Sequence, residues 1–195
     1  AAKGGAGKTP VQVEIIFQKP YLQRSIITSS QGTEITVLNG YDGWQRTEPA
    51  SDKTRWTLSL LKVDQVKSLR ANVWENLAFF RGIGTDGGRV EDLGPATADG
   101  ITCRKLAFIH SPDSVFYRYF DESTGRLVLT ETQRGEKIRE QGVIEVAGVK
   151  FPKVLITDTP KDDGTVQTVT ITFNRITVNE SASAGSFEVP LLISQ

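Results

Sequence analysis

The sequence contains very few sulfur-bearing residues, a single histidine and no long apolar run. Its 195 residues include one cysteine, one histidine and no methionine. A lone cysteine, Cys103, excludes an internal disulfide and a cysteine-based zinc site, and we expect it to be a small core residue of a strand. No apolar stretch approaches the roughly 18 residues of a membrane-spanning helix. Because the first residue is not methionine, we expect a processed or trimmed form.

An excess of charge of one sign is also absent. The chain has 23 basic and 23 acidic residues. This balance argues against a nucleic-acid partner, or an anionic membrane, held by bulk electrostatics. A chain of this length buries about 70% of the surface that its unfolded form exposes, which is enough for one domain.

The opening residues "KGGAGKT" have the spacing of the variant phosphate loop of partitioning-type ATPases. That loop works only between a strand and the N-terminus of a helix, whose free N–H groups face the phosphate. After Pro10, however, the chain continues as "VQVEIIFQ", whose alternation of apolar and polar residues predicts a strand. We therefore expect a flexible leader over residues 1–10 and no bound nucleotide.

The rest of the chain consists of short β-forming segments between frequent turn signals. "SSQGT", "NGYDG", "DESTG" and "PKDDG" are such turns, and segments such as "TEITVLNG", "SVFYRYFD" and "RLVLTETQ" lie between them. This spacing predicts an antiparallel meander, a sandwich or a barrel. No repeat or linker divides the chain, so we expect a single domain over residues 11–190.

One segment has the period of a helix instead. We expect a helix over residues 62–81, with Asp64 near its start and Gly82 after its end. Two interpretations stay open: the helix packs on a sheet as core, or it covers the mouth of a β-cup and faces a ligand cavity. Its apolar stripe comprises Val63, Val66, Leu69, Val73, Leu77 and Phe80.

No group of residues forms a convincing active site. His110 adjoins Ser111 in a predicted surface turn, a geometry that rarely aligns imidazole and hydroxyl. The aspartates of "TDTPKDDG" lack the oxygen spacing of the known calcium loop, so we expect a solvated hairpin tip there. We expect no catalytic residue, no metal and no cofactor, and hence a protein that is not an enzyme.

Several motifs occur in a suggestive order along residues 11–190. "KPYLQR" is followed by "NGYDGW", the amphipathic segment, D-x-x-T-G at 121–125, G-x-x-x-P at 148–152 and F-x-V-P at 187–190. Together they resemble the periplasmic lipoprotein-sorting carriers of the LolA/LolB-like superfamily. The resemblance departs at the start, where these carriers have a helix before the first strand.

The resemblance implies a mainly β fold with one or two helices, arranged as an antiparallel half-open β-barrel with a helical lid. It implies a non-enzymatic periplasmic carrier that holds acyl chains of lipoproteins or related lipids in a hydrophobic cavity. Membrane-associated donor and acceptor proteins are the partners it implies, with a membrane anchor in the full-length form as a further option. The alternative is an envelope-stress sensor or protein-interaction module of the same fold.

On this resemblance, we expect apolar and aromatic side chains of the early strands and the helix to bind the ligand. Arg24 matches the family's arginine after the "P-x-x-x-R" turn, which contacts the lid; its other interpretation is a solvent-facing strand residue. The expected ligand-binding residues are Phe17, Arg24, Ile26, Trp44, Trp56, Val73, Trp74, Leu77 and Phe80.

Overall fold

The structure, a computed structural model, describes residues 11–78, 81–183 and 185–190. The chain forms two compact units, which we name the N-terminal unit (residues 1–79 and 182–195) and the central unit (residues 80–181). Each unit has its own sheet and its own buried apolar clusters. The leader predicted over residues 1–10 lies outside the described residues, and the single domain over 11–190 stays a prediction.

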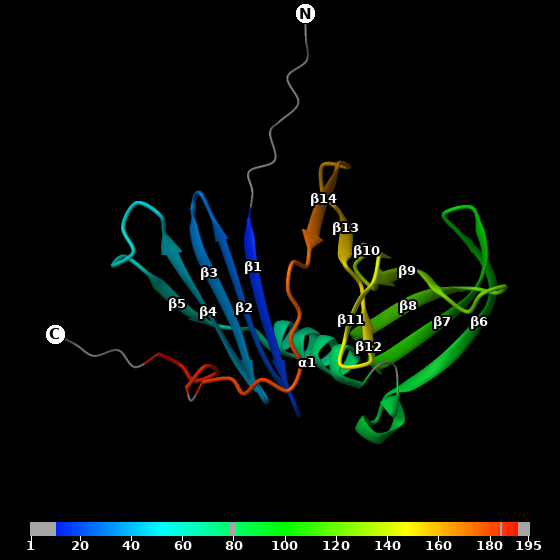
Figure 1. The fold of residues 1–195 in the computed structure, drawn as a ribbon, viewed down its shortest axis with the longest axis horizontal. Coiled ribbons are helices and arrows are strands. Elements are labelled where there is room, and N and C mark those ends of the chain that lie inside the picture. Colours follow the sequence, from blue (N-terminus) through cyan, green and yellow to red (C-terminus); the bar gives the residue numbers. More distant parts are fainter. Residues whose placement is uncertain (1–10, 79–80, 184, 191–195) are drawn as a thin grey trace, which may run out of the picture. The chain divides into compact units, whose positions relative to one another are not determined.

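The N-terminal unit contains a five-stranded antiparallel sheet in the order β1-β2-β3-β4-β5 (Figure 1). Each strand pairs with the next one along the chain, so the sheet is a simple meander, as the closely spaced turn signals predict. A helix, α1, follows the last strand. The elements are β1 (Gln12–Gln18), β2 (Leu22–Ser29), β3 (Gly32–Asn39), β4 (Asp42–Pro49), β5 (Thr57–Leu60) and α1 (Val63–Ala78).

Helix α1 confirms the helix predicted over 62–81 as far as the description extends, since residues 79 and 80 lie outside it. At its start, the backbone N–H of Lys62 donates to Gln65 Oε1 at 2.9 Å. This bond satisfies one backbone donor near the start of the helix. Four residues of the predicted stripe, Val66, Leu69, Val73 and Leu77, pack against β1 and β3 in a cluster with Phe17, Leu38 and Leu61. Val63 was wrongly placed in the stripe, because it lies in the first turn of the helix and is 69% exposed, and Phe80 lies outside the described residues.

Arg70 joins the middle of α1 to two turns of the sheet. Its guanidinium carbon lies 3.8 Å from the ring centroid of Tyr21 and 3.9 Å from that of Tyr41. Its Nη1 also donates to the carbonyl oxygen of Gly40 at 2.9 Å. One cation therefore stacks on two aromatic rings and bonds the backbone of the β3–β4 turn, which fixes the helix against this end of the sheet.

The central unit contains a seven-stranded antiparallel sheet in the order β14-β13-β10-β9-β8-β7-β6, with a two-stranded hairpin of β11 and β12 (Figure 1). A short 3₁₀ helix, η1, precedes it. The elements are η1 (Ile83–Asp86), β6 (Arg89–Ala98), β7 (Ile101–Ser111), β8 (Ser114–Asp121), β9 (Leu127–Thr132), β10 (Lys137–Gln141), β11 (Ile144–Val146), β12 (Val149–Phe151), β13 (Val154–Pro160) and β14 (Val166–Thr172).

A buried apolar cluster lies on one face of the central sheet. Ala98, Cys103, Tyr119 and Leu129 form this cluster, and Cys103 is fully buried in β7. The sequence prediction that this cysteine is a core residue of a strand is therefore confirmed. With one α-helix among the described residues and every ladder antiparallel, the prediction of a mainly antiparallel β chain is confirmed as well.

A group of charged side chains connects distant parts of the central sheet. Arg139 on β10 donates from Nε and Nη2 to the carboxylate of Asp99, at 2.7 and 2.9 Å, in the β6–β7 turn. Its Nη1 donates to Asp158 on β13 at 2.8 Å. The hydrogen bond from Arg139 lowers the pKa of Asp99. The pKa of Asp158 is lowered mainly by the hydrogen bond from the Thr168 hydroxyl and less by the one from Arg139. Two strands separate β10 from the β6–β7 hairpin, so the sheet curls to make this contact.

Neither sheet closes on itself within the described residues, because no ladder joins β1 to β5 or β14 to β6. No helix in the same part of the chain is long and apolar enough to cross a membrane.

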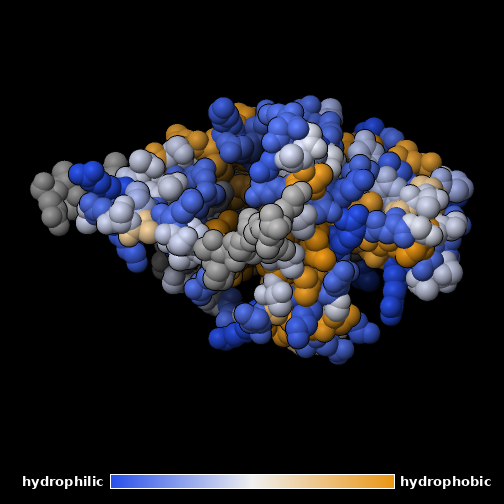
Figure 2. Space-filling model, turned by 90° about the horizontal axis from the view of Figure 1, so that it is seen from above, coloured by the Kyte–Doolittle hydropathy of each residue, from blue (hydrophilic) through white to orange (hydrophobic). Residues whose placement is uncertain are grey.

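The face shown in Figure 2 is mostly hydrophilic, with smaller hydrophobic areas between the polar side chains. Large apolar residues are nevertheless exposed at several positions, Leu60 and Val166 among them.

Candidate functional site

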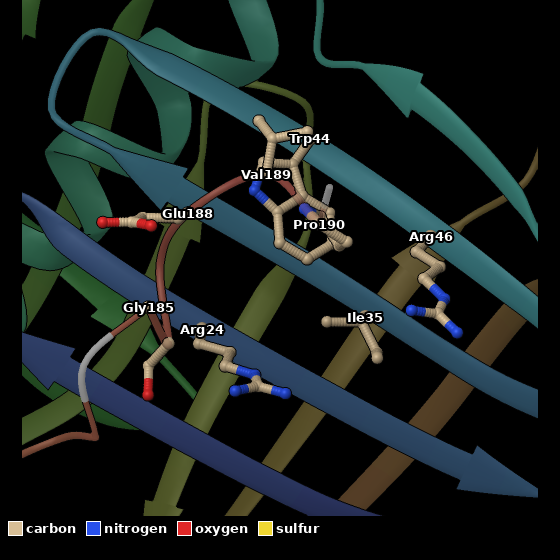
Figure 3. Close-up of a pocket in the computed structure, with 9 residues that line it drawn as sticks. Arg24, Ile35, Trp44, Arg46, Gly185, Glu188, Val189 and Pro190 are labelled. Atoms are coloured by element: carbon tan, nitrogen blue, oxygen red, sulfur yellow. The ribbon is translucent and has the colours of Figure 1, made fainter. Parts of the chain in front are cut away.

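A pocket of about 320 Å³ lies within the N-terminal unit. Its floor comes from β2, β3 and β4, and its other wall comes from the segment over residues 185–190, which returns to this sheet (Figure 3). The pocket combines two arginines, one glutamate and several apolar side chains. The lining residues are Arg24, Ile35, Trp44, Arg46, Gly185, Ser186, Glu188, Val189 and Pro190.

The F-x-V-P motif at 187–190 explains why the returning segment lies on the sheet. Phe187 is buried against Val37 and Trp44, and this aromatic anchor holds the backbone close to β3 and β4. Within the segment, the backbone N–H of Glu188 donates to the carbonyl oxygen of Gly185 at 3.1 Å. A weak sequence motif thus corresponds to one wall of the pocket.

Two-residue turns determine which side chains meet at the floor of the pocket. One such turn connects β2 to β3 and another connects β3 to β4, so the register of both strand pairs is fixed. Arg24 pairs with Val37, which in turn pairs with Trp44. In the next row, Ile35 pairs with Arg46. The two arginines therefore come from the strands on either side of β3, and their positions are offset by two residues along the strands. Figure 3 shows Ile35 between their side chains.

Arg24 is a half-buried cation without a carboxylate partner among the described residues. Its Nε is buried and has no hydrogen-bond acceptor there. The neighbouring positions on β1 and β3 are Ile16 and Val37, both apolar. Arginine carries five N–H donors and does not lose its proton in proteins. This side chain therefore offers several donors to the pocket.

Arg46 is partly satisfied by its own surroundings. Its Nη2 lies 2.7 Å from Glu48 Oε1, and its guanidinium carbon lies 4.4 Å from the ring centroid of Trp56. Its Nε is nevertheless buried without an acceptor among the described residues. Arg46 thus keeps its ion pair with Glu48 and still carries one unsatisfied donor.

Trp44 supplies the aromatic part of the pocket. The side chain is 4% exposed, and its buried Nε1–H also has no acceptor among the described residues. Gly43 before it is required by packing, because a Cβ at that position would lie 2.6 Å from Leu61 Cδ1 and 2.9 Å from the carbonyl oxygen of Val37. The glycine-tryptophan pair of "NGYDGW" therefore has a structural reason.

The single carboxylate in the lining, Glu188, does not neutralise these donors. Figure 3 shows its carboxylate directed away from both guanidinium groups, and no ion pair joins it to either arginine in the described part of the chain. Glu188 therefore does not satisfy the unpaired donors of Arg24, Trp44 and Arg46.

The predicted ligand-binding residues divide between the two faces of this sheet. Successive residues of a strand point to opposite faces. Val37 contacts the returning segment, whereas Leu38 contacts α1, so the pocket and the helix lie on opposite faces. Arg24 and Trp44 line the pocket, Ile26 pairs with Ile35 of its floor, and Trp56 stacks on Arg46.

The remaining predicted residues lie elsewhere or outside the description. Phe17, Val73 and Leu77 belong to the core between α1 and the sheet, and Val73 is 0% exposed. Trp74 is half-buried on α1, and Phe80 lies outside the described residues. That these residues line a ligand cavity stays a prediction.

Other positions that the sequence singled out have structural explanations. His110 lies within β7 and meets Phe116 edge-on at 5.8 Å between ring centroids, so the turn predicted there is wrong. The turn comes later, because Ser111 pairs with Ser114. No group of three or more histidine, cysteine, aspartate or glutamate side chains suited to a metal ion occurs among the residues the structure describes.

The D-x-x-T-G and G-x-x-x-P motifs are both turns. The carboxylate of Asp121 accepts bonds from the Thr124 hydroxyl at 2.6 Å and from the hydroxyl and N–H of Ser123 at 2.7 and 2.8 Å. These bonds lower its pKa to about 2. Gly125 has φ of 68° and closes this turn, while Gly148 has φ of 77° between β11 and β12.

Comparison with known proteins identifies the fold. No family model matches the chain, and no curated protein matches it in sequence. A Vibrio parahaemolyticus domain described as an outer membrane lipoprotein-sorting protein matches with a TM-score of 0.55 and 11% identity, over 91% of this chain and 80% of that one. A DUF1329 family protein from Desulfovibrio piger matches with a TM-score of 0.51 and 14% identity over the same shares.

A LolA superfamily protein from Nitrosomonas europaea is also similar, with a TM-score of 0.42 and 12% identity, over 82% of this chain and 80% of that one. The first two likenesses show the fold. The chain therefore shares its fold with the lipoprotein-sorting domain from Vibrio parahaemolyticus and the DUF1329 protein from Desulfovibrio piger, and the fold that the resemblance implies is confirmed.

Proposed function

We propose that this protein is a non-enzymatic carrier of the bacterial cell envelope that binds acyl chains of lipoproteins or related lipids. The likeness to the lipoprotein-sorting domain, which extends over 91% of this chain, is the observation that supports it. A periplasmic location and membrane-associated donor and acceptor proteins belong to the same proposal. No catalytic role is part of it, and neither is a metal or a nucleotide.

The physical requirement of such a carrier is a graded affinity for hydrocarbon. Burying a methylene group contributes about 0.8 kcal/mol, which corresponds to about a fourfold gain in affinity per added methylene. Ordering and association costs then reduce the total. A carrier should therefore bind a homologous series of fatty acids with a steep dependence on chain length, up to the length that its cavity accommodates.

Lipid extraction from the purified full-length protein, followed by mass spectrometry, tests the proposal directly. We expect acylated molecules in stoichiometric amounts after expression in an envelope-targeted form. Displacement of a fluorescent fatty acid by acids of increasing length should show the gain of about fourfold per methylene. No extracted lipid together with no dependence on chain length would contradict the carrier proposal.

A pair of leucine variants tests the helix residues as ligand contacts. Leu77 is half-buried on α1, whereas Leu60 is 75% exposed on β5. If the apolar face of α1 contributes to the cavity, Leu77→Ala weakens fatty-acid uptake and Leu60→Ala does not. A loss of stability in Leu77→Ala with unchanged uptake would assign Leu77 to the core alone.

The alternative function is a sensor or interaction module of the same fold. The exposed edge strand β14 favours it, since Val166 and Val169 are 62% and 44% exposed there. An unpaired strand edge is a common site for adding a strand from another protein. Absence of extracted lipid, with capture of a defined protein partner that is lost on Val169→Lys, would favour this function.

A further inference from the structure

We propose that Arg24, with Arg46 and Trp44, forms a binding site for one oxoanion, the terminal carboxylate or phosphate of an amphiphilic ligand. The pocket in the N-terminal unit would hold the polar end of a molecule whose hydrocarbon part binds elsewhere. The link to an amphiphile rests on the proposed carrier function, whereas the anion site itself rests on the pocket alone.

The first argument is the cost of the unsatisfied donors. Arg24 Nε, Arg46 Nε and Trp44 Nε1 are all buried, and none has an acceptor among the described residues. Buried polar groups in native proteins are nearly always hydrogen-bonded, because an unpaired buried donor lowers the free energy of unfolding. All three donors belong to residues that line one pocket, so the surroundings of this pocket are short of hydrogen-bond acceptors.

The second argument is charge. Arg46 already pairs with Glu48, whereas Arg24 has no carboxylate partner among the described residues. Its planar fork of donors matches a carboxylate or phosphate. One unpaired guanidinium suits a group of low charge, since the carboxylates of Glu48 and Glu188 would repel a polyanion. This favours a single terminal oxoanion over a nucleotide.

The third argument is the apolar remainder of the wall. Ile35, Val189 and Pro190 line the same pocket, and Trp44 adds an aromatic side chain. A hydrated inorganic ion gains nothing from these side chains. The first carbons of an alkyl chain attached to the anion would contact them, which is why we infer an amphiphile.

The test compares four probes: decyl phosphate, decanoate, decanol and inorganic phosphate. Binding is measured by calorimetry on the wild-type chain, Arg24→Gln, Trp44→Phe and the control Arg55→Gln. Arg55 is 85% exposed and lies outside the pocket. We expect the wild type to bind the two anionic amphiphiles about tenfold or more tightly than decanol. Arg24→Gln should remove this preference and leave decanol affinity unchanged, and Arg55→Gln should keep it.

The remaining results distinguish a free anion from an amphiphile as the ligand, and they test the anion site separately from the carrier function. Trp44→Phe keeps an aromatic ring and removes one donor, so it should lose part of the preference even where Arg24→Gln folds poorly. Inorganic phosphate binding that is lost in Arg24→Gln would support the anion site with a free ion as its source. Equal affinity for decanoate and decanol would overturn the anion site and leave the carrier intact. Phosphate binding without decyl binding would contradict the carrier and retain the site.

Discussion

At the scale of single residues, Asp121 shows how a family-like motif encodes a turn. Its carboxylate accepts three bonds from the residues that follow, and they lower its pKa to about 2. The usual pKa of an unfolded aspartate is about 3.9. The folded state therefore favours the charged form. Its contribution to stability is present above about pH 4 and is lost as the pH falls from about 4 to about 2.

Replacing Asp121 by asparagine should remove this pH dependence. We expect the difference in melting temperature between wild type and Asp121→Asn to be constant above about pH 5 and to shrink as the pH falls toward about 2. Thermal unfolding followed by circular dichroism across this range provides the measurement. Asp162→Asn is the control, because Asp162 is exposed and makes no hydrogen bond to a described residue. A difference that grows on acidification would contradict the assignment.

At the scale of elements, α1 is held to its sheet by a polar contact as well as by its apolar stripe. Arg70 stacks between Tyr21 and Tyr41 and bonds the carbonyl of Gly40. A stacked cation contributes about 0.5–2 kcal/mol, and a hydrogen bond adds about 1 kcal/mol. Lysine keeps the charge and loses the planar fork.

Arg70→Gln should therefore lower the free energy of unfolding by about 1.5–3 kcal/mol, and Arg70→Lys by a smaller amount. Urea unfolding followed by tryptophan fluorescence measures both. Arg55→Gln should change it by less than about 0.5 kcal/mol, because that side chain is 85% exposed. If Arg70→Gln behaved like Arg55→Gln, the stacking would have no energetic role.

Strands in which apolar and polar residues alternate regularly could be predicted from the sequence. Strands that contain glycine or proline, or mostly polar residues, could not. β6 contains Gly94 and Pro95. An edge strand tolerates proline, and the register shift between Asp92 and Gly94 accommodates the glycine as a bulge. In the other direction, the β-branched run "VQTVTITFNRITV" at 166–178 predicts one long strand, yet β14 ends at Thr172. Local propensity there is not matched by a partner strand.

The candidate site was only partly predictable for a similar reason. Arg24 and Trp44 were predicted from the motifs that contain them, and both line the pocket. Arg46 was missed because only the register brings it beside Ile35. Recognising a two-residue turn after Asn39 would have paired these positions in advance. The F-x-V-P motif contains Phe187, but the position of this side chain against Val37 and Trp44 depends on tertiary packing between segments far apart in the sequence.

At the scale of the whole molecule, each unit contains its own residues by which its unfolding can be followed. All three tryptophans, at positions 44, 56 and 74, belong to the N-terminal unit. The single cysteine, Cys103, is fully buried in the central unit. Tryptophan fluorescence therefore follows one unit during unfolding, and the reactivity of the thiol follows the other.

A core substitution in one unit should affect mainly the reporter of that unit. Leu38 is 0% exposed, and Leu38→Ala should lower the free energy of unfolding by about 2–5 kcal/mol as seen by fluorescence. We expect the urea midpoint for exposure of Cys103 to stay nearly unchanged. Leu129→Ala, in the cluster of the central unit, should produce the opposite pattern. Equal shifts of both reporters in both variants would show that the units unfold as one.

The contact of Arg139 with Asp99 has a kinetic consequence for the central unit. The two residues are separated by 40 positions, and β8 and β9 lie between the β6–β7 hairpin and β10. Closing a contact across 40 positions is costly before the intervening strands have paired, so we expect this bond to form late in folding. Interactions absent from the transition state slow unfolding and leave the folding rate unchanged. Arg139 therefore acts on the lifetime of the folded sheet rather than on the speed with which the sheet is made.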